Sequence, residues 1–218
     1  MTFFLPMFTV FFLSACGGIE DTSVIPTVVT PKVGGQFVDA AVEGLAYKCS
    51  SGKEGLTTND GNYSCEVGDS VTFKLASFEF ISLEANNTFY TPYSLFPNSL
   101  NSALNLARLL QSMDSDADVN NSKIVINKML EALLPANIDY ASKSFENNVI
   151  TALAISFVGV HEAQQRMNSS ILALNPTAIV EPIPVANAGL DRNSTLNTDV
   201  ALDASSSIAK TYTWSVLS

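Results

Sequence analysis

The spacing of apolar and polar positions changes twice along this chain of 218 residues. Thr2 to Leu13 is an almost unbroken apolar run. It has the length of a signal-peptide core and is too short to cross a hydrocarbon layer of ~30 Å as a helix. From Val33 onward short stretches alternate apolar and polar residues, as half-buried strands do, and from about Asn98 the spacing becomes helical. The pattern predicts a leader, then strands, then helices.

The strand region is divided by turn residues. We expect strands over 36–39, 42–49 and 71–75, the last with clear alternation. Asp60-Gly61 predicts a tight hairpin turn and Gly68-Asp69 a second turn, because Gly and Asp tolerate the positive φ angles that such turns need.

The helical region contains several apolar stripes. The first stripe leaves Arg108 and Gln111 off the apolar face and consists of Leu100, Ala103, Leu104, Ala107, Leu110 and Met113. A second stripe, ended by Pro135, consists of Ile126, Met129, Leu130 and Leu133. Residues 145–157 and 161–167 predict two more helices, separated near Gly159. Short connections favour a small antiparallel helical cluster.

The apolar run ends in Leu13-Ser14-Ala15-Cys16, which resembles a bacterial lipobox. The resemblance implies a signal peptide over 1–15, cleavage before Cys16, and acyl chains on Cys16. Each buried methylene contributes about 0.8 kcal/mol, so two or three acyl chains anchor a protein stably in a membrane. Gly17, rather than Asp, follows the cysteine, and by resemblance to Gram-negative lipoproteins this favours the outer membrane, where we expect the protein to face the periplasm or the cell surface. The alternative is an uncleaved hydrophobic N-terminus or a buried strand, because no Lys or Arg precedes Lys32.

Composition narrows the classes of function. Only 15% of residues are charged and the formal net charge is −10, so a nucleic-acid partner is disfavoured by repulsion from the phosphates. The single histidine, His161, excludes a multi-histidine zinc centre. His161-Glu162 is not accompanied by a free cysteine, a second histidine or a Gly-x-Ser-x-Gly elbow, so we expect a packing or capping role for His161. No phosphate-binding Gly loop is recognisable either.

Residues 16–32 read as a tether and residues 33–81 as a β-module. Val42-Glu43-Gly44-Leu45-Ala46 and the segment Thr57 to Ser64 (TTNDGNYS) resemble carboxypeptidase regulatory-like β-sandwich modules of secreted bacterial proteins. Leu45 and Cys65 depart from the usual residues of that family. The resemblance implies a spacer or folding aid.

Two cysteines, Cys49 and Cys65, lie in this module on strands on either side of the Asp60-Gly61 turn. Neighbouring strands bring Cα atoms within disulfide reach, and an exported chain favours the bond. Two reduced core thiols are the alternative.

Residues 82–97 form an aromatic connector that either binds sugars or forms an interdomain seam, which we favour. The helical domain follows over 98–174. Within it, Asn105 to Asp114 (NLARLLQSMD) resembles a signature that follows such β-modules in some marine-bacterial lipoproteins.

A Pro-rich, semi-rigid linker over 175–184 precedes the last segment, 185–218. Val185 to Asp191, Val200 to Ser207 and Tyr212 to Ser215 resemble the opening of a polycystic-kidney-disease (PKD) repeat, an Ig-like sandwich. Such a sandwich needs roughly 80–100 residues, so we expect a truncated repeat.

The acidic loop between the first two helical stripes has two interpretations. Oxygen ligands at Asp114, Asp116, Asp118 and Asn120 have the spacing of a calcium loop. Val119 and Val125 stand where that loop requires Gly and a bidentate Glu. We therefore favour a solvated loop in which Asp114 or Asp118 caps the next helix.

The sequence predicts a multi-domain α+β protein with a small β-sandwich module, a helical cluster and an incomplete Ig-like sandwich. We expect a lipid-anchored, modular cell-envelope protein with a structural, adhesive or binding role and no catalysis or obligatory cofactor. Its partners are the membrane, through Cys16, and an envelope protein or polysaccharide. The alternative is a carbohydrate- or peptide-binding accessory region of a secreted hydrolase.

Overall fold

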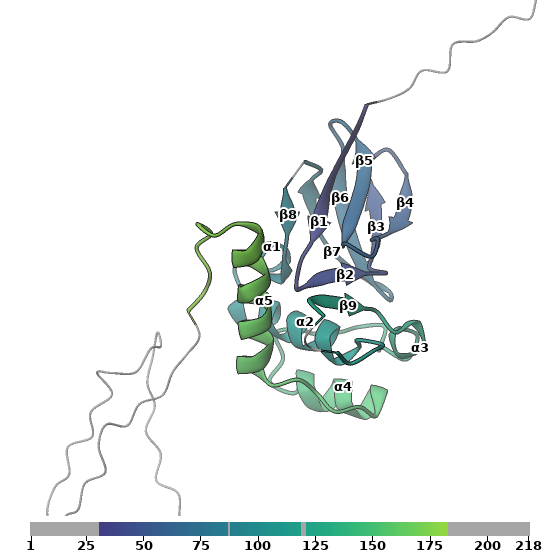
Figure 1. Ribbon diagram of the computed structural model, residues 1–218. Helices are drawn as coiled ribbons and strands as arrows, with labels where there is room; N and C mark the ends of the chain where they lie inside the picture. The colour runs from purple at the N-terminus through teal and green to yellow at the C-terminus, as the bar shows by residue number, and fades with distance from the viewer. Residues whose placement is uncertain (1–30, 87, 119–120, 183–218) are drawn as a thin grey trace, which may run out of the picture.

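The computed structural model describes residues 31–86, 88–118 and 121–182, which form an α+β fold (Figure 1). The lipobox with Cys16, most of the tether, Asn120 and residues 185–218 lie outside the described residues. The strands are β1 (Lys32–Phe37), β2 (Ala41–Glu43), β3 (Ala46–Cys49), β4 (Glu54–Leu56), β5 (Asn62–Glu66), β6 (Ser70–Leu75), β7 (Phe78–Glu84), β8 (Phe89–Tyr90) and β9 (Lys123–Val125). The helices are α1 (Pro92–Leu95), α2 (Leu100–Ser112), α3 (Lys128–Glu131), α4 (Phe145–Leu153) and α5 (Val160–Leu174).

Two sheets carry the N-terminal half. One has the order β5-β1-β8 and the other β4-β3-β6-β7. The predicted strand 71–75 is confirmed as β6, whose residues alternate between buried and half-buried. Phe37 of β1 and Tyr63 of β5 contact the ring of Phe73 of β6, with centroid distances of 4.9 and 5.4 Å. The sheets therefore pack through interleaved aromatic rings, which prefer such tilted contacts.

Two glycines divide the sequence into these strands. The strand predicted over 42–49 is interrupted at Gly44, whose φ of +85° disfavours any other residue, so β2 and β3 join different sheets. The turn at Asp60-Gly61 is confirmed, with a φ of +74° at Gly61. A Cβ atom there would lie 2.5 Å from the carbonyl oxygen of Phe37. The hairpin is not formed, because β4 pairs with β3 and β5 pairs with β1.

The disulfide between Cys49 and Cys65 is confirmed, with a Cα–Cα distance of 5.6 Å. Its strands are not hydrogen-bonded neighbours as expected. Cys49 ends β3 in one sheet and Cys65 lies in β5 of the other, so the bond joins the two sheets. Both cysteines are buried in the core.

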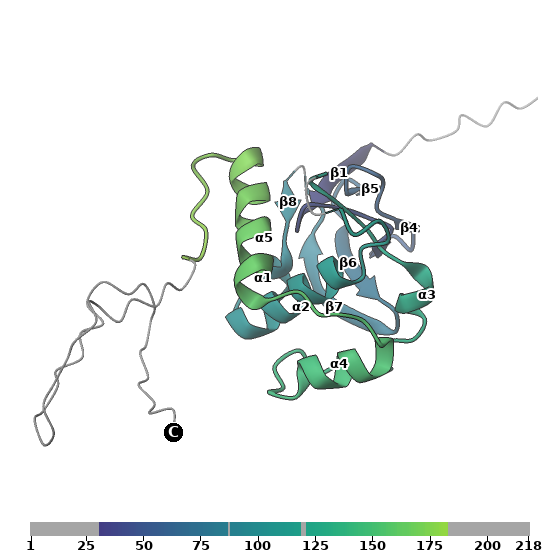
Figure 2. The ribbon, with the colours of Figure 1, turned by 60° about the horizontal axis from the view of Figure 1, so that its bottom comes forward.

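Helix α2 lies beneath the sheets, and its sides are covered by other elements (Figure 2). Ser99 caps it by accepting a hydrogen bond from the Ser102 amide. The predicted helix over 100–113 is thus confirmed, but Arg108 and Gln111, expected off the buried face, are both buried. One hydrophobic core extends from Phe37 to Leu153 and contains side chains of the sheets and of α2 and α4.

The second apolar stripe, Ile126 to Leu133, forms a helix over one turn only, the short α3 (Lys128–Glu131). Residues 123–125, just before the stripe, form β9, which pairs in parallel with β2 of the N-terminal half. The side chain of Asn127 then caps the short helix α3, leaving Met129 and Leu133 exposed. The helical spacing does not mark a buried face, because only Ile126 of the four stripe residues is buried and Leu130 is partly buried.

We expect the disulfide to dominate the stability of the sheets. Replacing both cysteines by alanine releases a loop with a sequence separation of 16 residues. The chain-entropy model predicts a loss of about 3 kcal/mol for a loop of this size. Urea unfolding followed by circular dichroism measures this loss. A reducing agent should destabilise the wild type and leave the double variant unchanged; an equal effect on both would contradict the prediction.

Candidate functional site

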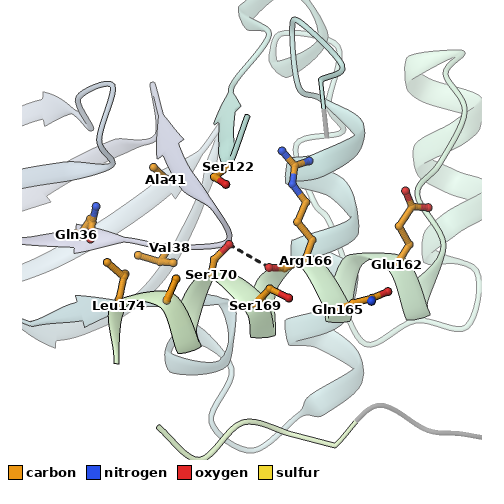
Figure 3. A pocket seen from close by; sticks show the side chains of 11 residues that line it. Gln36, Val38, Ala41, Ser122, Glu162, Gln165, Arg166, Ser169, Ser170 and Leu174 are labelled. Carbon is orange, nitrogen blue, oxygen red and sulfur yellow. Dashed lines mark hydrogen bonds between the residues drawn. The ribbon is translucent and has the colours of Figure 1, made fainter. Parts of the chain in front are cut away.

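A groove of about 580 Å³ lies between the outer face of α5 and the strands β1 and β2 (Figure 3). Most of its lining residues carry hydrogen-bonding groups, and they include Gln36, Ser122, Glu162, Gln165, Arg166, Ser169 and Ser170. Val38, Ala41, Ala173 and Leu174 add a smaller apolar part. Such a mixture of hydroxyl, amide and charged groups suits a polar ligand that hydrogen-bonds along a surface.

The amphipathic pattern of α5 places these side chains in the groove. Gly159 begins the helix, as the sequence predicted for the break near this residue. Ala163, Met167 and Ile171 are buried in a second apolar cluster with Leu104 and Ala107 of α2. The opposite positions, including Gln165 and Ser169, therefore face outward along the groove.

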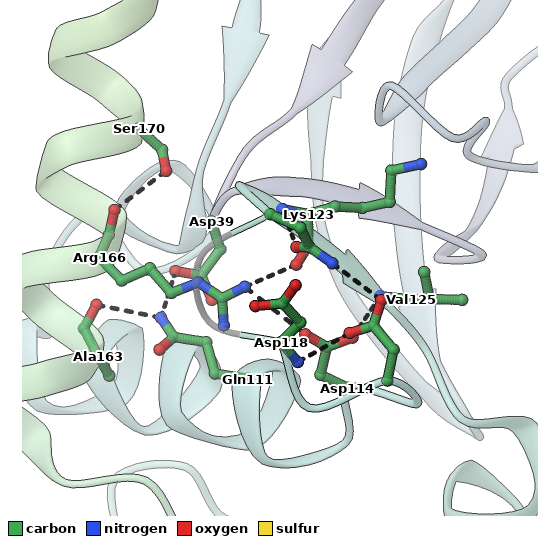
Figure 4. A network of polar contacts seen from close by, with 11 residues as sticks. Asp39, Gln111, Asp114, Asp118, Lys123, Val125, Ala163, Arg166 and Ser170 are labelled. Atoms are coloured by element: carbon green, nitrogen blue, oxygen red, sulfur yellow. Dashed lines mark hydrogen bonds and ion pairs between the residues drawn. The ribbon is translucent and has the colours of Figure 1, made fainter.

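Arg166 connects the groove to the interior (Figure 4). Its Nη2 donates a hydrogen bond of 2.6 Å to the carbonyl oxygen of Lys123 and lies 3.6 Å from Oδ2 of Asp114. The Ser170 hydroxyl donates to the carbonyl oxygen of Arg166 at 3.0 Å. The guanidinium therefore holds β9 against α5.

Asp39 lies fully buried behind the groove, at the turn between β1 and β2. Its Oδ1 accepts a hydrogen bond of 3.0 Å from Nε2 of Gln111, which also donates to the carbonyl oxygen of Ala163 at 3.1 Å. Oδ2 of Asp39 has no hydrogen-bond partner within the described part of the chain. Burial raises the pKa of Asp39 well above its ordinary value, while the hydrogen bond from Gln111 and the charge of Arg166 oppose the rise.

The acidic loop is not solvated at Asp114. The side chain of Asp114 is buried, and its Oδ1 accepts a hydrogen bond of 2.9 Å from the Val125 amide. Burial raises the pKa of Asp114, and the Val125 amide and the charge of Arg166 oppose this. Neither Asp114 nor Asp118 caps the next helix, because Asn127 does so. Both interpretations of the loop missed this inward orientation.

The candidate calcium ligands that are described do not form one cluster. Within residues 31–182, gaps aside, a single group of acidic, Cys or His ligand atoms gathers within 4.8 Å, formed by Cys49, Cys65 and Asp69. Its sulfurs are joined in the disulfide. Asp69 accepts hydrogen bonds from Ser50, Ser51 and the Glu66 amide, which lower its pKa to about 2. These contacts indicate a structural role for the group.

The remaining candidates have structural positions. His161 is exposed in the first turn of α5 and does not line the groove, although its neighbour Glu162 does. The connector forms a seam: Phe80 contacts Phe96 and Tyr140 with centroid distances of 5.8 and 5.9 Å. Tyr90 and Tyr93 are only half-exposed, and the Tyr93 hydroxyl donates to Oδ1 of Asn168 at 3.1 Å.

Sequence reasoning missed the buried polar network of Asp39, Gln111 and Arg166. Each of these residues lies within a segment whose spacing gave no hint of a buried polar side chain. For Gln111 the one signal was its place in the signature segment Asn105 to Asp114.

No family model matches this chain, and neither a curated protein nor a solved structure matches it. Within the part of the chain that the structure describes, no helix has the length and hydrophobicity needed to cross a bilayer.

The buried Asp39 predicts a specific pH dependence. A carboxyl group whose pKa is raised on folding binds more protons in the folded than in the unfolded state. The free energy of unfolding therefore falls as the pH rises from about 4 towards the raised pKa, by about 1.4 kcal/mol per unit. Asp39→Asn should remove the contribution of Asp39 to this slope, because the amide oxygen still accepts from Gln111 and carries no charge; the contribution of Asp114, whose pKa is also raised, should remain.

The measurement is urea unfolding at a series of pH values from 4 to 8. Asp60→Asn, at an exposed position, is the matched control and should follow the wild type. In Asp39→Asn, Arg166 still contacts Asp114 and the carbonyl oxygen of Lys123. The readout is how the free energy of unfolding changes with pH, not its absolute value. Parallel curves for Asp39→Asn and the wild type would count against the prediction.

Proposed function

We propose that this chain is a lipid-anchored, modular protein of the bacterial outer membrane, with a structural, adhesive or binding role and no catalysis of its own. The observation that carries the proposal is the apolar run that ends in Leu13-Ser14-Ala15-Cys16. Acylation of Cys16 anchors the protein, and the residues up to Pro31 act as a tether. The folded region is then a spacer with a regulatory-like β-module, followed by a PKD-like segment.

The arrangement of the folded region supports a spacer role. The chain enters at the free end of β1 and leaves after α5 on another side of the molecule (Figures 1 and 2). The inter-sheet disulfide and the main core join the sheets to α2, and a second apolar cluster holds α5 against α2. A rigid body of this kind keeps whatever follows Pro182 at a distance from the anchor.

The groove beside α5 supports the binding part of the role. Gln36, Gln165 and Ser169 present donors and acceptors along its length, which suits an envelope polysaccharide or an extended peptide. The same groove favours the second candidate, an accessory binding region of a secreted hydrolase. Binding of purified envelope polysaccharide by wild type but not by Gln165→Ala/Ser169→Ala supports a ligand in the groove.

The anchor is tested directly by labelling. Cys16→Ser should remove incorporation of radiolabelled palmitate and leave an unprocessed precursor, because Cys16 supplies the acylated thiol. The control is Cys49→Ser/Cys65→Ser, which keeps Cys16 and should be labelled like the wild type. Equal labelling of Cys16→Ser and the wild type would remove the lipoprotein proposal.

A further inference from the structure

The chain reverses direction after α5 and runs back along it. Asn175 ends the helix, the Ala178 amide donates to the Asn175 carbonyl oxygen at 2.9 Å, and the Thr177 hydroxyl donates to Oδ1 of Asn175 at 2.9 Å. Beyond this turn, the extended segment that ends at Pro182 lies beside the helix (Figure 1). The Pro-rich linker predicted from the sequence is therefore docked over its described part.

Two side-chain amides of α5 hold this segment. Nδ2 of Asn168 donates a hydrogen bond of 2.7 Å to the carbonyl oxygen of Glu181. Nε2 of Gln164, one turn earlier, donates to the carbonyl oxygens of Glu181 and Pro182, both at 3.2 Å. Tyr93 of α1 donates to Oδ1 of Asn168 and so fixes the orientation of that amide.

Apolar contacts add to these hydrogen bonds. Ala178 and Val180 pack against the cluster formed by Leu104, Ala107, Ala163, Met167 and Ile171. Ile179, between them, is fully exposed. The alternation shows that one face of an extended segment is seated on the helices and the other faces solvent.

Burial makes these contacts selective. Gln164 and Asn168 are buried in the presence of the segment. A buried amide that loses its acceptor is energetically costly, so two such donors favour the seated state over a partly detached one. Because the acceptors are backbone carbonyls, the site recognises an extended backbone carrying small apolar side chains.

We propose that α1 and α5 form a clamp for the extended segment that follows the turn at Asn175 and ends at Pro182, and that this clamp fixes the direction of the chain at Pro182. The clamp is independent of the proposed anchor and of the nature of the residues that follow. The clamp binds a segment of the same chain, and what it recognises is an extended backbone that contains proline.

A nitroxide label at Ile179→Cys tests the clamp. The side chain at this position is fully exposed, so the label itself does not disturb the contacts. In the full chain with Cys16→Ser, the remaining native cysteines are joined in the disulfide, which leaves one thiol for labelling. Continuous-wave electron paramagnetic resonance then reports the mobility of the segment.

Gln164→Ala/Asn168→Ala should shorten the rotational correlation time of the label several-fold relative to the parent protein. The matched control is Gln165→Ala/Ser169→Ala, on the outward face of the same helix, which should give the parent spectrum. A mobile label in the parent protein, or an immobile one in Gln164→Ala/Asn168→Ala, overturns the proposal.

A variant on the segment itself separates release from unfolding. Val180→Asp places a charge against the apolar cluster and replaces no residue of the helices themselves. It should release the label as the amide variants do while the circular dichroism spectrum stays unchanged. A label that remains immobile in Val180→Asp contradicts the clamp even if the amide variants fail to fold.

Discussion

The fold depends on a row of buried or half-buried polar side chains along α2 and its end. They occur at every third position, and each reaches a different part of the chain. Asn105 donates to the Tyr140 carbonyl, Arg108 to Glu146 and the Val158 carbonyl, and Gln111 to Asp39 and the Ala163 carbonyl, while Asp114 accepts from the Val125 amide. Since a buried polar group without a partner is costly, the chain after α2 must wrap around this helix to supply these partners.

This constraint links the features described at the surface. Gln111 holds α5 through the Ala163 carbonyl, and Asp114 holds it through Arg166. The position of α5 in turn defines both the groove on its outer face and the clamp for the segment after it. Arg108 also lies over the ring of Phe157, with its guanidinium carbon 4.5 Å from the centroid, so the same row orders the approach to α5. Changes in the row should therefore disturb the groove and the clamp together.

Local patterns predicted some parts of the structure and failed for others. Alternation identified β6, helical spacing identified α2, and the cysteines identified the disulfide, because each signal lies within a short segment. The same spacing predicted a longer helix over Ile126 to Leu133 than the single turn of α3, and it did not reveal that residues 123–125, just before it, pair with β2. The turn at Asp60-Gly61 was predicted without revealing that its flanking strands join different sheets. Arg108 and Gln111 were predicted to lie off the buried face because they fall outside the apolar stripe. The partners that allow them to be buried are distant in sequence. The groove and the clamp likewise depend on contacts that no local pattern encodes.

The connection between entry and exit gives the spacer proposal a mechanical meaning. β1 begins at the end where the tether joins, and pairs antiparallel with β5 from Lys32↔Glu66 to Gln36↔Asn62. If the tether is anchored as we propose, a pull along β1 loads these pairs in shear, so several hydrogen bonds must break together. The disulfide ties β5 to the opposite sheet, which prevents β5 from leaving with β1. Force applied to the segment that ends at Pro182 acts first on the hydrogen bonds that Gln164 and Asn168 of α5 donate to it, and only then on the core. Tension between anchor and C-terminal region should thus release the clamp first and leave the sheets intact.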